Sequence, residues 1–271
     1  MEPVDVLAER FPQLAVRDVV VIDDGWDSLV YEVNGEWIFR FPRRAEVERW
    51  LEVELTLLPE LAGSLPVAVP RPELVARNGL LCVGYRKLPG EPATIVDDRI
   101  GADLAAFLRA LHGFPAERAR DLGVPSFEPA TWRARFADLA DDFRRRALPF
   151  LAADERTRAE VLFAEIDGLR FEPVLVHADL GPEHVLVRNG RVTGVIDWSD
   201  VRVGDPALDL AWPLHAAPAA VARAYPVDEE ARRRALFYHR FAPWYEVTYG
   251  LDTGRDDVVA RGLAGVRDRL P

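Results

Sequence analysis

The chain has 271 residues, 49% of them hydrophobic and 29% charged, a length that suits one large domain or two small lobes around a sizeable core. A formal net charge of −11 argues against a nucleic-acid partner and leaves room for a cationic substrate. No apolar run reaches the roughly 18 residues of a membrane span, and the acidic N-terminal residues lack the apolar segment of a secretory signal. Cys82 is the single cysteine, which excludes an internal disulfide, so we expect a cytoplasmic protein. By default we expect a monomer.

The N-terminal third is rich in β-prone runs. Asn34-Gly35, between two such runs, predicts a tight hairpin turn, and prolines keep residues 65–70 extended. Turn chemistry from Arg86 onward predicts a hinge. The predicted elements are a helix over 4–11, strands over 16–22, 29–33, 37–41 and 80–85, and a helix over 46–60.

Beyond the hinge the apolar spacing becomes mostly helical. The predicted helices cover residues 100–111, 131–146, 154–170, 208–215, 229–250 and 256–270. His112 lies at the end of the first of these helices, before Gly113, where we expect a structural role. A mostly antiparallel sheet followed by helices predicts an α+β fold.

The stretch from 174 to 212 concentrates polar residues around a predicted hairpin. His177 and Asp179 follow one short strand, His184 precedes the next, and Asp197 ends the strand that returns after the Asn-Gly turn at 189–190. The hairpin therefore brings Asp179, His184 and Asp197 to one end of a rigid ribbon, an arrangement that suits a divalent metal and a general base. A zinc site made by His177, Asp179 and His184 is an alternative, but it lacks a fourth ligand.

These motifs resemble the catalytic and metal loops of protein-kinase-like enzymes, and more closely the aminoglycoside phosphotransferase family. That family reads His-Gly-Asp-x-x-x-x-Asn and then Ile-Asp-[Trp/Phe], and residues 204–211 of this chain resemble its usual continuation. The chain departs from the pattern with Ala178 and His184. Histidine at the second position is similar to the macrolide and the gentamicin/kanamycin-type branches.

The resemblance implies a two-lobed, protein-kinase-like fold. Residues 1–88 would form a lobe that covers the nucleotide, with a hinge at about 83–90. Residues 89–271 would form a mostly helical lobe with the catalytic loop, the metal loop and the acceptor-binding region.

The resemblance also implies roles for the central residues. Asp179 would be the catalytic base, and Asp197 and His184 would lie on the metal side and bind Mg²⁺, His184 directly or through water. His177 would hold the loop through hydrogen bonds. Asp205 would brace the catalytic loop by accepting backbone donors, and Asp209 would cap or orient the next helix.

In the first lobe, Arg40 takes the place of the phosphate-binding lysine of kinases. Glu54 is its predicted partner, and Glu52 is the alternative on another face of the same helix. The phosphate donor would be ATP or GTP. The residues expected to contact the nucleotide, besides Arg40, are Gly25, Trp26 and Ser28 in the covering loop and Val83, Tyr85, Lys87 and Leu88 at the hinge.

The acceptor is expected to bind in the C-terminal region. The candidate residues are Asp200, Asp209, Trp212, Trp244, Tyr245, Glu246 and Tyr249. The loop at 25–28, the compact length and the acidic balance resemble the gentamicin/kanamycin-type kinases, so we expect an aminoglycoside. The acid-poor segment 212–217 and the resemblance of residues 247–254 to macrolide kinases favour a macrolide instead. A metabolic kinase for choline, a sugar or homoserine is a further alternative. A non-catalytic pseudokinase is another, although both Asp179 and Asp197 are present.

Overall fold

The computed structural model describes residues 3–24 and 28–271, which form two compact units. One unit is made of residues up to 95, 117–124 and 179–201, and the other of 96–116, 125–178 and 202–271. Both units are discontinuous in sequence, so they do not test a lobe boundary at residue 88, which stays a prediction.

A five-stranded antiparallel sheet forms the centre of the first unit. Its strands are β1 (Val19–Asp24), β2 (Ser28–Val33), β3 (Trp37–Pro42), β4 (Pro72–Ala76) and β5 (Cys82–Arg86), in the order β1-β2-β3-β5-β4. The predicted hairpin is confirmed, because Asn34 and Gly35 adopt φ angles of 57° and 70°, the left-handed pair of a tight turn. The edge strand β4 was not predicted, because Pro72 argues against a strand when the sequence is read alone. An edge strand nevertheless tolerates proline.

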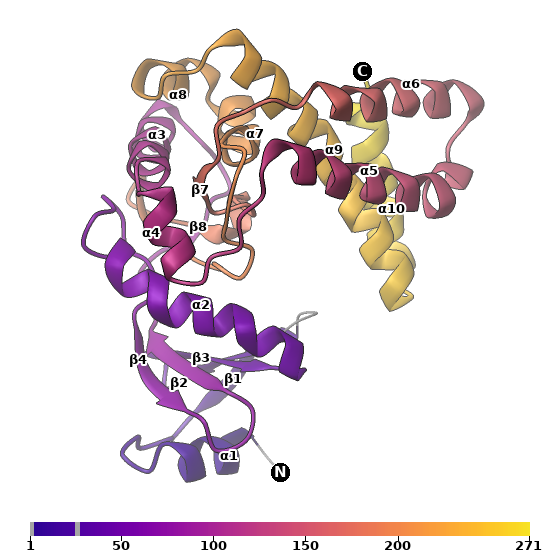
Figure 1. The fold of residues 1–271 in the computed structure, drawn as a ribbon. Coiled ribbons are helices and arrows are strands. Elements are labelled where there is room, and N and C mark those ends of the chain that lie inside the picture. The colour runs from indigo at the N-terminus through magenta and orange to yellow at the C-terminus, as the bar shows by residue number, and fades with distance from the viewer. Residues whose placement is uncertain (1–2, 25–27) are drawn as a thin grey trace. The chain divides into compact units, whose positions relative to one another are not determined.

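Two helices contribute to the core of this unit. They are α1 (Pro3–Arg10) and α2 (Ala45–Leu61). Leu7 of α1 packs in one apolar cluster with Phe39 of β3. In Figure 1, α2 lies along the sheet, and its Leu51 packs against Leu81 and Val83. The short α4 (Ala116–Asp121), not predicted from sequence, is followed by Leu122, whose carbonyl accepts the hydroxyl of Thr56 in α2 at 2.8 Å.

A smaller sheet carries the central hairpin. It consists of β6 (Glu91–Pro92), β8 (Val185–Arg188) and β9 (Arg191–Val195). Asn189 and Gly190 adopt φ angles of 55° and 68°, which confirms the second predicted Asn-Gly turn. The segment 65–70 is extended as expected. Ala68 bonds to β9 through both its backbone groups: its N–H donates to Thr193 O at 3.2 Å, and its carbonyl accepts the N–H of Val195 at 2.9 Å.

The second unit is mostly helical, with a two-stranded antiparallel sheet. Its elements are α3 (Asp98–His112), α5 (Pro129–Arg146), α6 (Ala153–Ala164), β7 (Val174–Val176), β10 (Arg202–Gly204), α7 (Ala207–Ala216), α8 (Pro218–Ala224), α9 (Glu229–Thr253) and α10 (Asp256–Arg269). Asp97 caps α3 by accepting the backbone N–H of Ile100 at 2.9 Å. The helix predicted over 154–170 is wrong in its second part, since α6 ends at Ala164 and tightens into a 3₁₀ turn that stops at Gly168.

Large aromatic side chains fill the core of the second unit. The largest fully buried ones are Trp132, Phe143, Phe237, Phe241, Trp244 and Phe107. Antiparallel β strands and a segregated set of helices make this an α+β fold, as predicted. No helix in residues 3–24 and 28–271 is long and apolar enough to cross a membrane.

His239 of α9 gives this helical core a pH dependence. Its ring stacks on His215 of α7, with 3.9 Å between the centroids. Burial, then the charges of Arg269, His215 and Arg240, lower the pKa of His239 to about 4. The unfolded chain, where a histidine pKa is about 6.5, therefore takes up the proton first as the pH falls.

We expect the free energy of unfolding to drop by roughly 1–2 kcal/mol through this residue between about pH 7 and pH 5. Urea unfolding of the wild type and of His239→Gln at both pH values measures the effect. The glutamine variant should lose less stability over this window than the wild type. Equal losses in the two proteins would remove His239 as the source.

Candidate active site

The three polar side chains of the central hairpin meet as the sequence predicted. His184 Nδ1 lies 2.8 Å from the backbone oxygen of Asp179, to which it donates, and 3.4 Å from Asp179 Oδ2. His184 Nε2 lies 3.7 Å from Asp197 Oδ2. One imidazole thus stands between two carboxylates, and its own backbone carbonyl accepts the N–H of Ile196 at 2.9 Å, which ties the two loops together.

A buried ion pair adds a fourth and a fifth group to the same site. Arg40 Nη1 lies 2.7 and 2.9 Å from the two carboxylate oxygens of Glu54, and the side chains are 9% and 5% exposed. Arg40 Nη2 lies 3.4 Å from Asp197 Oδ1. Glu54 is therefore confirmed as the partner, whereas Glu52 pairs at the surface with Arg77. The pair joins α2 and β3 to the loop of Asp197.

The backbone of Asp197 is bent out of the strand that precedes it. Its φ angle is 58°, a left-handed value that aspartate tolerates better than most residues. The next residue, Trp198, is fully buried and donates its indole N–H to Val195 O at 3.0 Å, and Ser199 Oγ donates to Asp197 Oδ1 at 2.6 Å. We did not predict Ser199; a hydroxyl two residues after the aspartate was the available signal.

The surroundings of Asp179 and His184 raise the pKa values of both side chains. The pKa of Asp179 is raised to about 6, first because neighbouring protein removes part of its water and then because Asp200, Asp197 and Glu183 repel its charge, while His184 opposes the rise. Burial lowers the pKa of His184, but Asp179 and Asp197 outweigh burial and raise it. A carboxylate poised near neutrality is suited to accept a proton from a hydroxyl.

Two aspartates have exchanged the roles expected of them. Asp209, and not Asp205, braces the catalytic loop: its carboxylate accepts the backbone N–H groups of His177 and Ala178, each at 2.8 Å. Asp205 instead accepts the N–H of Ala207 at the start of α7, at 2.9 Å. Its other oxygen accepts Arg234 Nε at 2.9 Å and the hydroxyl of Tyr238 at 2.8 Å.

Ala178, directly before Asp179, carries backbone strain. Its φ angle is 69°, where a Cβ is unfavourable and where the resembled family places glycine. The bonds from His177 N and Ala178 N to Asp209 hold this conformation.

Replacing Ala178 with glycine should relieve the strain. We expect Ala178→Gly to raise the free energy of unfolding by roughly 0.5 kcal/mol, since the about 1–2 kcal/mol of left-handed strain exceeds the added backbone entropy of glycine. Ala110→Gly, in the regular helix α3, should instead lose roughly 0.5–1 kcal/mol. Urea unfolding compares the two, and a loss of the same size at both positions would contradict the strain.

The predicted nucleotide contacts fall into three groups. Gly25 and Trp26 lie outside the described residues. Ser28 is buried, and its hydroxyl has no hydrogen-bond partner among residues 3–24 and 28–271. Val83 and Tyr85 are buried in β5, where Val83 lies opposite Arg40.

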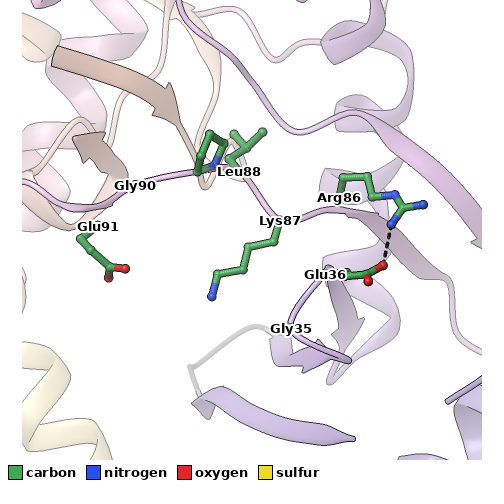
Figure 2. A pocket seen from close by; sticks show the side chains of 8 residues that line it. Gly35, Glu36, Arg86, Lys87, Leu88, Gly90 and Glu91 are labelled. Carbon is green, nitrogen blue, oxygen red and sulfur yellow. Dashed lines mark hydrogen bonds and ion pairs between the residues drawn. The ribbon is translucent and has the colours of Figure 1, made fainter. Parts of the chain in front are cut away.

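The remaining hinge candidates border an open hollow of about 420 Å³. Figure 2 shows Lys87 and Glu91 reaching toward its open side and Arg86 bonded to Glu36 at 2.9 Å. Leu88 also lines it. Lys87 Nζ is held by Glu32 Oε2 at 2.7 Å, so the one lysine of the chain is tied to β2 beside this hollow.

Two of the predicted acceptor residues are wrong. Asp209 is fully buried under the catalytic loop, and Trp244 is fully buried and stacked on Phe143 with 5.7 Å between the ring centroids. The prediction for Trp244 failed because the spacing of aromatic residues along α9 does not show which face of the helix packs into the core. Tyr245 is 45% exposed. The partly or fully exposed candidates, which stay predictions, are Asp200, Trp212, Tyr245, Glu246 and Tyr249.

The described part of the chain contains no group of three or more His, Cys, Asp or Glu side chains arranged to hold a metal ion. This argues against the zinc alternative from His177, Asp179 and His184.

Residues 18–244 match the model of the phosphotransferase enzyme family. The chain belongs to this family. The motifs of the central hairpin predicted this membership.

Similar proteins agree with this membership. The chain is 31% identical over 199 residues to the uncharacterized protein YcbJ of Bacillus subtilis, across 64% of this chain and 61% of that protein. The GDP and kanamycin complex of APH(2")-IIia superposes with a TM-score of 0.85 at 25% identity, over 98% of this chain and 97% of that one. Macrolide 2'-phosphotransferase MphH from Brachybacterium faecium gives a TM-score of 0.76 at 26% identity, over 98% of both chains.

The chain spans about three fifths of the length of YcbJ. The solved structures, in contrast, are covered almost completely, which confirms the predicted kinase-like fold of the aminoglycoside phosphotransferases.

Proposed function

We propose that this enzyme transfers the γ-phosphate of ATP or GTP to a hydroxyl group of an aminoglycoside antibiotic. The observation that carries the proposal is the convergence of Asp179, His184, Asp197 and the Arg40–Glu54 pair within one site. The APH(2")-IIia structure, a complex with GDP and kanamycin, supports both the donor and the acceptor.

Asp179 is the base of the proposed reaction. Its exposed carboxylate accepts a hydrogen bond from the acceptor hydroxyl and orients the oxygen toward the γ-phosphate. It receives the proton as the new O–P bond forms and the bond from the γ-phosphorus to the β–γ bridging oxygen breaks, which releases ADP or GDP. With a pKa of about 6 it is mostly ionised at neutral pH and yet basic enough to take part. Positioning supplies most of the rate enhancement, because phosphoryl transfer needs little covalent help.

Arg40 provides the fixed positive charge for the phosphates of the nucleotide. It remains a cation at every relevant pH, and Glu54 fixes its orientation through two oxygens. Ser28 offers a buried hydroxyl with no other partner among the described residues, which suits a phosphate oxygen.

Mg²⁺ is the metal implied by this family, and the donor set fits it. Asp197 presents a carboxylate, the type of ligand magnesium prefers, and one or two carboxylates together with substrate phosphates suffice for this ion. Asp197 would hold the ion, with His184 beside it through water, since a nitrogen ligand suits a hard cation poorly. When bound, the ion neutralises charge on the phosphates.

The acceptor is inferred from charge and likeness. A net charge of −11 favours a substrate with several ammonium groups, and the TM-score of 0.85 to the kanamycin complex exceeds the 0.76 to the macrolide enzyme. A macrolide is the second candidate, supported by the apolar segment Trp212–Ala217, in which none of the residues is acidic.

An assay of ADP or GDP formation in the presence of Mg²⁺ tests the proposal, and the release of this product is the quantity measured. ATP and GTP are offered separately with kanamycin, gentamicin, erythromycin, choline, homoserine or no acceptor. We expect release that depends on an aminoglycoside. Release that depends only on erythromycin would favour the second candidate, and dependence only on choline or homoserine would overturn the antibiotic substrate. Nucleotide binding without turnover on any acceptor would overturn the proposal.

A further inference from the structure

A chain of buried polar groups continues beneath the catalytic loop. Besides the two backbone N–H groups of the loop, the carboxylate of Asp209 faces His112, whose Nε2 lies 3.2 Å from Oδ2. The other ring nitrogen, Nδ1, lies 2.7 Å from the hydroxyl oxygen of Tyr225. The side chains of His112 and Asp209 are 5% and 0% exposed, so water competes little for the bond between them, whereas Tyr225 is half-buried.

The chemistry of the groups fixes the direction of the bonds. An aspartate carboxylate only accepts, so Nε2 of His112 carries the proton and donates to Asp209. In a neutral imidazole Nδ1 is then the acceptor, and Tyr225 donates to it. Burial, then the charges of Asp209 and Asp205, raise the pKa of Tyr225 to about 12, which keeps its hydroxyl protonated.

Tight packing holds the two rings in this geometry. His112 is the last residue of α3, and Tyr225 follows directly on α8. A Cβ at Gly101 of α3 would meet the Cβ atoms of Ala217 and Ala220 at 2.7 and 3.0 Å, so α3 and α8 approach as closely as glycine allows. The His112 ring meets the Tyr225 ring edge to face, with 5.5 Å between centroids. This packing and the two polar contacts together orient the imidazole toward Asp209.

We propose that His112, oriented by Tyr225, is a positioning residue for phosphoryl transfer. It holds the carboxylate of Asp209 where this accepts the N–H groups of His177 and Ala178, and so stabilises the left-handed Ala178 that precedes Asp179 in the chain. The effect on turnover rests on the proposed function above, whereas the bracing of the loop does not.

Three variants separate positioning from general stability. His112→Leu removes the donor to Asp209, and His112→Gln keeps a donor at the place of Nε2 but offers Tyr225 no acceptor at the place of Nδ1. Tyr225→Phe removes only the orienting hydroxyl. Val266→Ala, in the core of α10 far along the chain from these groups, lowers stability without touching them and serves as the control.

Hydrogen–deuterium exchange of the peptide that spans residues 174–181 reports the bracing directly. We expect His112→Leu to speed exchange of the His177 and Ala178 amides by about tenfold, and His112→Gln to keep them near the wild-type rate. Tyr225→Phe should lie between the two in the wild-type background and should add nothing to His112→Gln. Wild-type exchange in His112→Leu, or faster exchange in Val266→Ala as well, would overturn the proposal.

Steady-state kinetics on the responding acceptor complete the test. His112→Leu should lower kcat by about tenfold with the nucleotide KM changed by less than about twofold, and His112→Gln should recover most of the loss. An equal loss of kcat in both variants would overturn a positioning role. If the wild type turns over no acceptor, the proposed function fails, and the exchange rates still decide whether His112 braces the loop. If His112→Leu does not fold, His112→Gln and Tyr225→Phe alone decide.

Discussion

Replacement of Asp179 with asparagine is expected to lower kcat by about 10²–10⁴-fold. The amide has nearly the shape of the carboxylate, but it cannot take the proton of the acceptor hydroxyl. The KM for the nucleotide should change little, because the nucleotide contacts proposed for Arg40 and Ser28 are left intact. Single-turnover and steady-state kinetics with the responding acceptor measure both quantities.

Glu172→Gln is the matched control for this variant. It removes an exposed carboxylate just before β7, outside the constellation of the site, and should leave kcat unchanged. Loss of activity in both variants would point to a general effect of negative charge. Full turnover by Asp179→Asn would reject the aspartate as the base.

The second large effect is expected in stability, from Glu54→Gln. Arg40 would remain buried with a neutral amide beside it and with Asp197 at 3.4 Å as its other anionic neighbour. Breaking a buried pair on one side is strongly destabilising, and we expect a loss of roughly 2–4 kcal/mol in the free energy of unfolding, measured by urea. The nucleotide KM should rise as well, because Arg40 loses its fixed orientation.

Glu52→Gln tests the same helix two residues away. Glu52 also pairs with an arginine, Arg77, but at the surface, where an ion pair contributes about 0–1 kcal/mol. We expect a change of less than about 1 kcal/mol and an unaltered KM. Similar losses for Glu52→Gln and Glu54→Gln would contradict the assignment of Glu54 as the buried partner.

Local chemistry made part of this structure predictable. Asn34-Gly35 and Asn189-Gly190 specify their turns because both residues tolerate a positive φ, and these two turns set the registers of the hairpins that carry Arg40 and Asp197. Glu54 and Glu52 differ by two helical positions, so one faces the sheet and the other faces solvent. At these positions a short-range pattern decides the geometry, and the predictions are confirmed.

Long-range pairing could not be predicted in the same way. Asp205 and Asp209 stand four residues apart and have the same chemistry, and which one meets the catalytic loop depends on how α7 packs. Trp244 shows the same limit, since an aromatic residue in a mixed helix fits either a binding surface or a core. His112 seemed a simple helix terminus because its partners, Asp209 and Tyr225, lie about a hundred residues away in sequence.

Mass spectrometry of kanamycin after incubation with the enzyme, Mg²⁺ and ATP or GTP tests the central claim most directly. We expect a product heavier by one phosphoryl group with the wild type and with Glu172→Gln, and almost none with Asp179→Asn. Unmodified kanamycin in every reaction, together with a phosphorylated product from another acceptor, would contradict the aminoglycoside assignment. An equal yield from Asp179→Asn would contradict the mechanism.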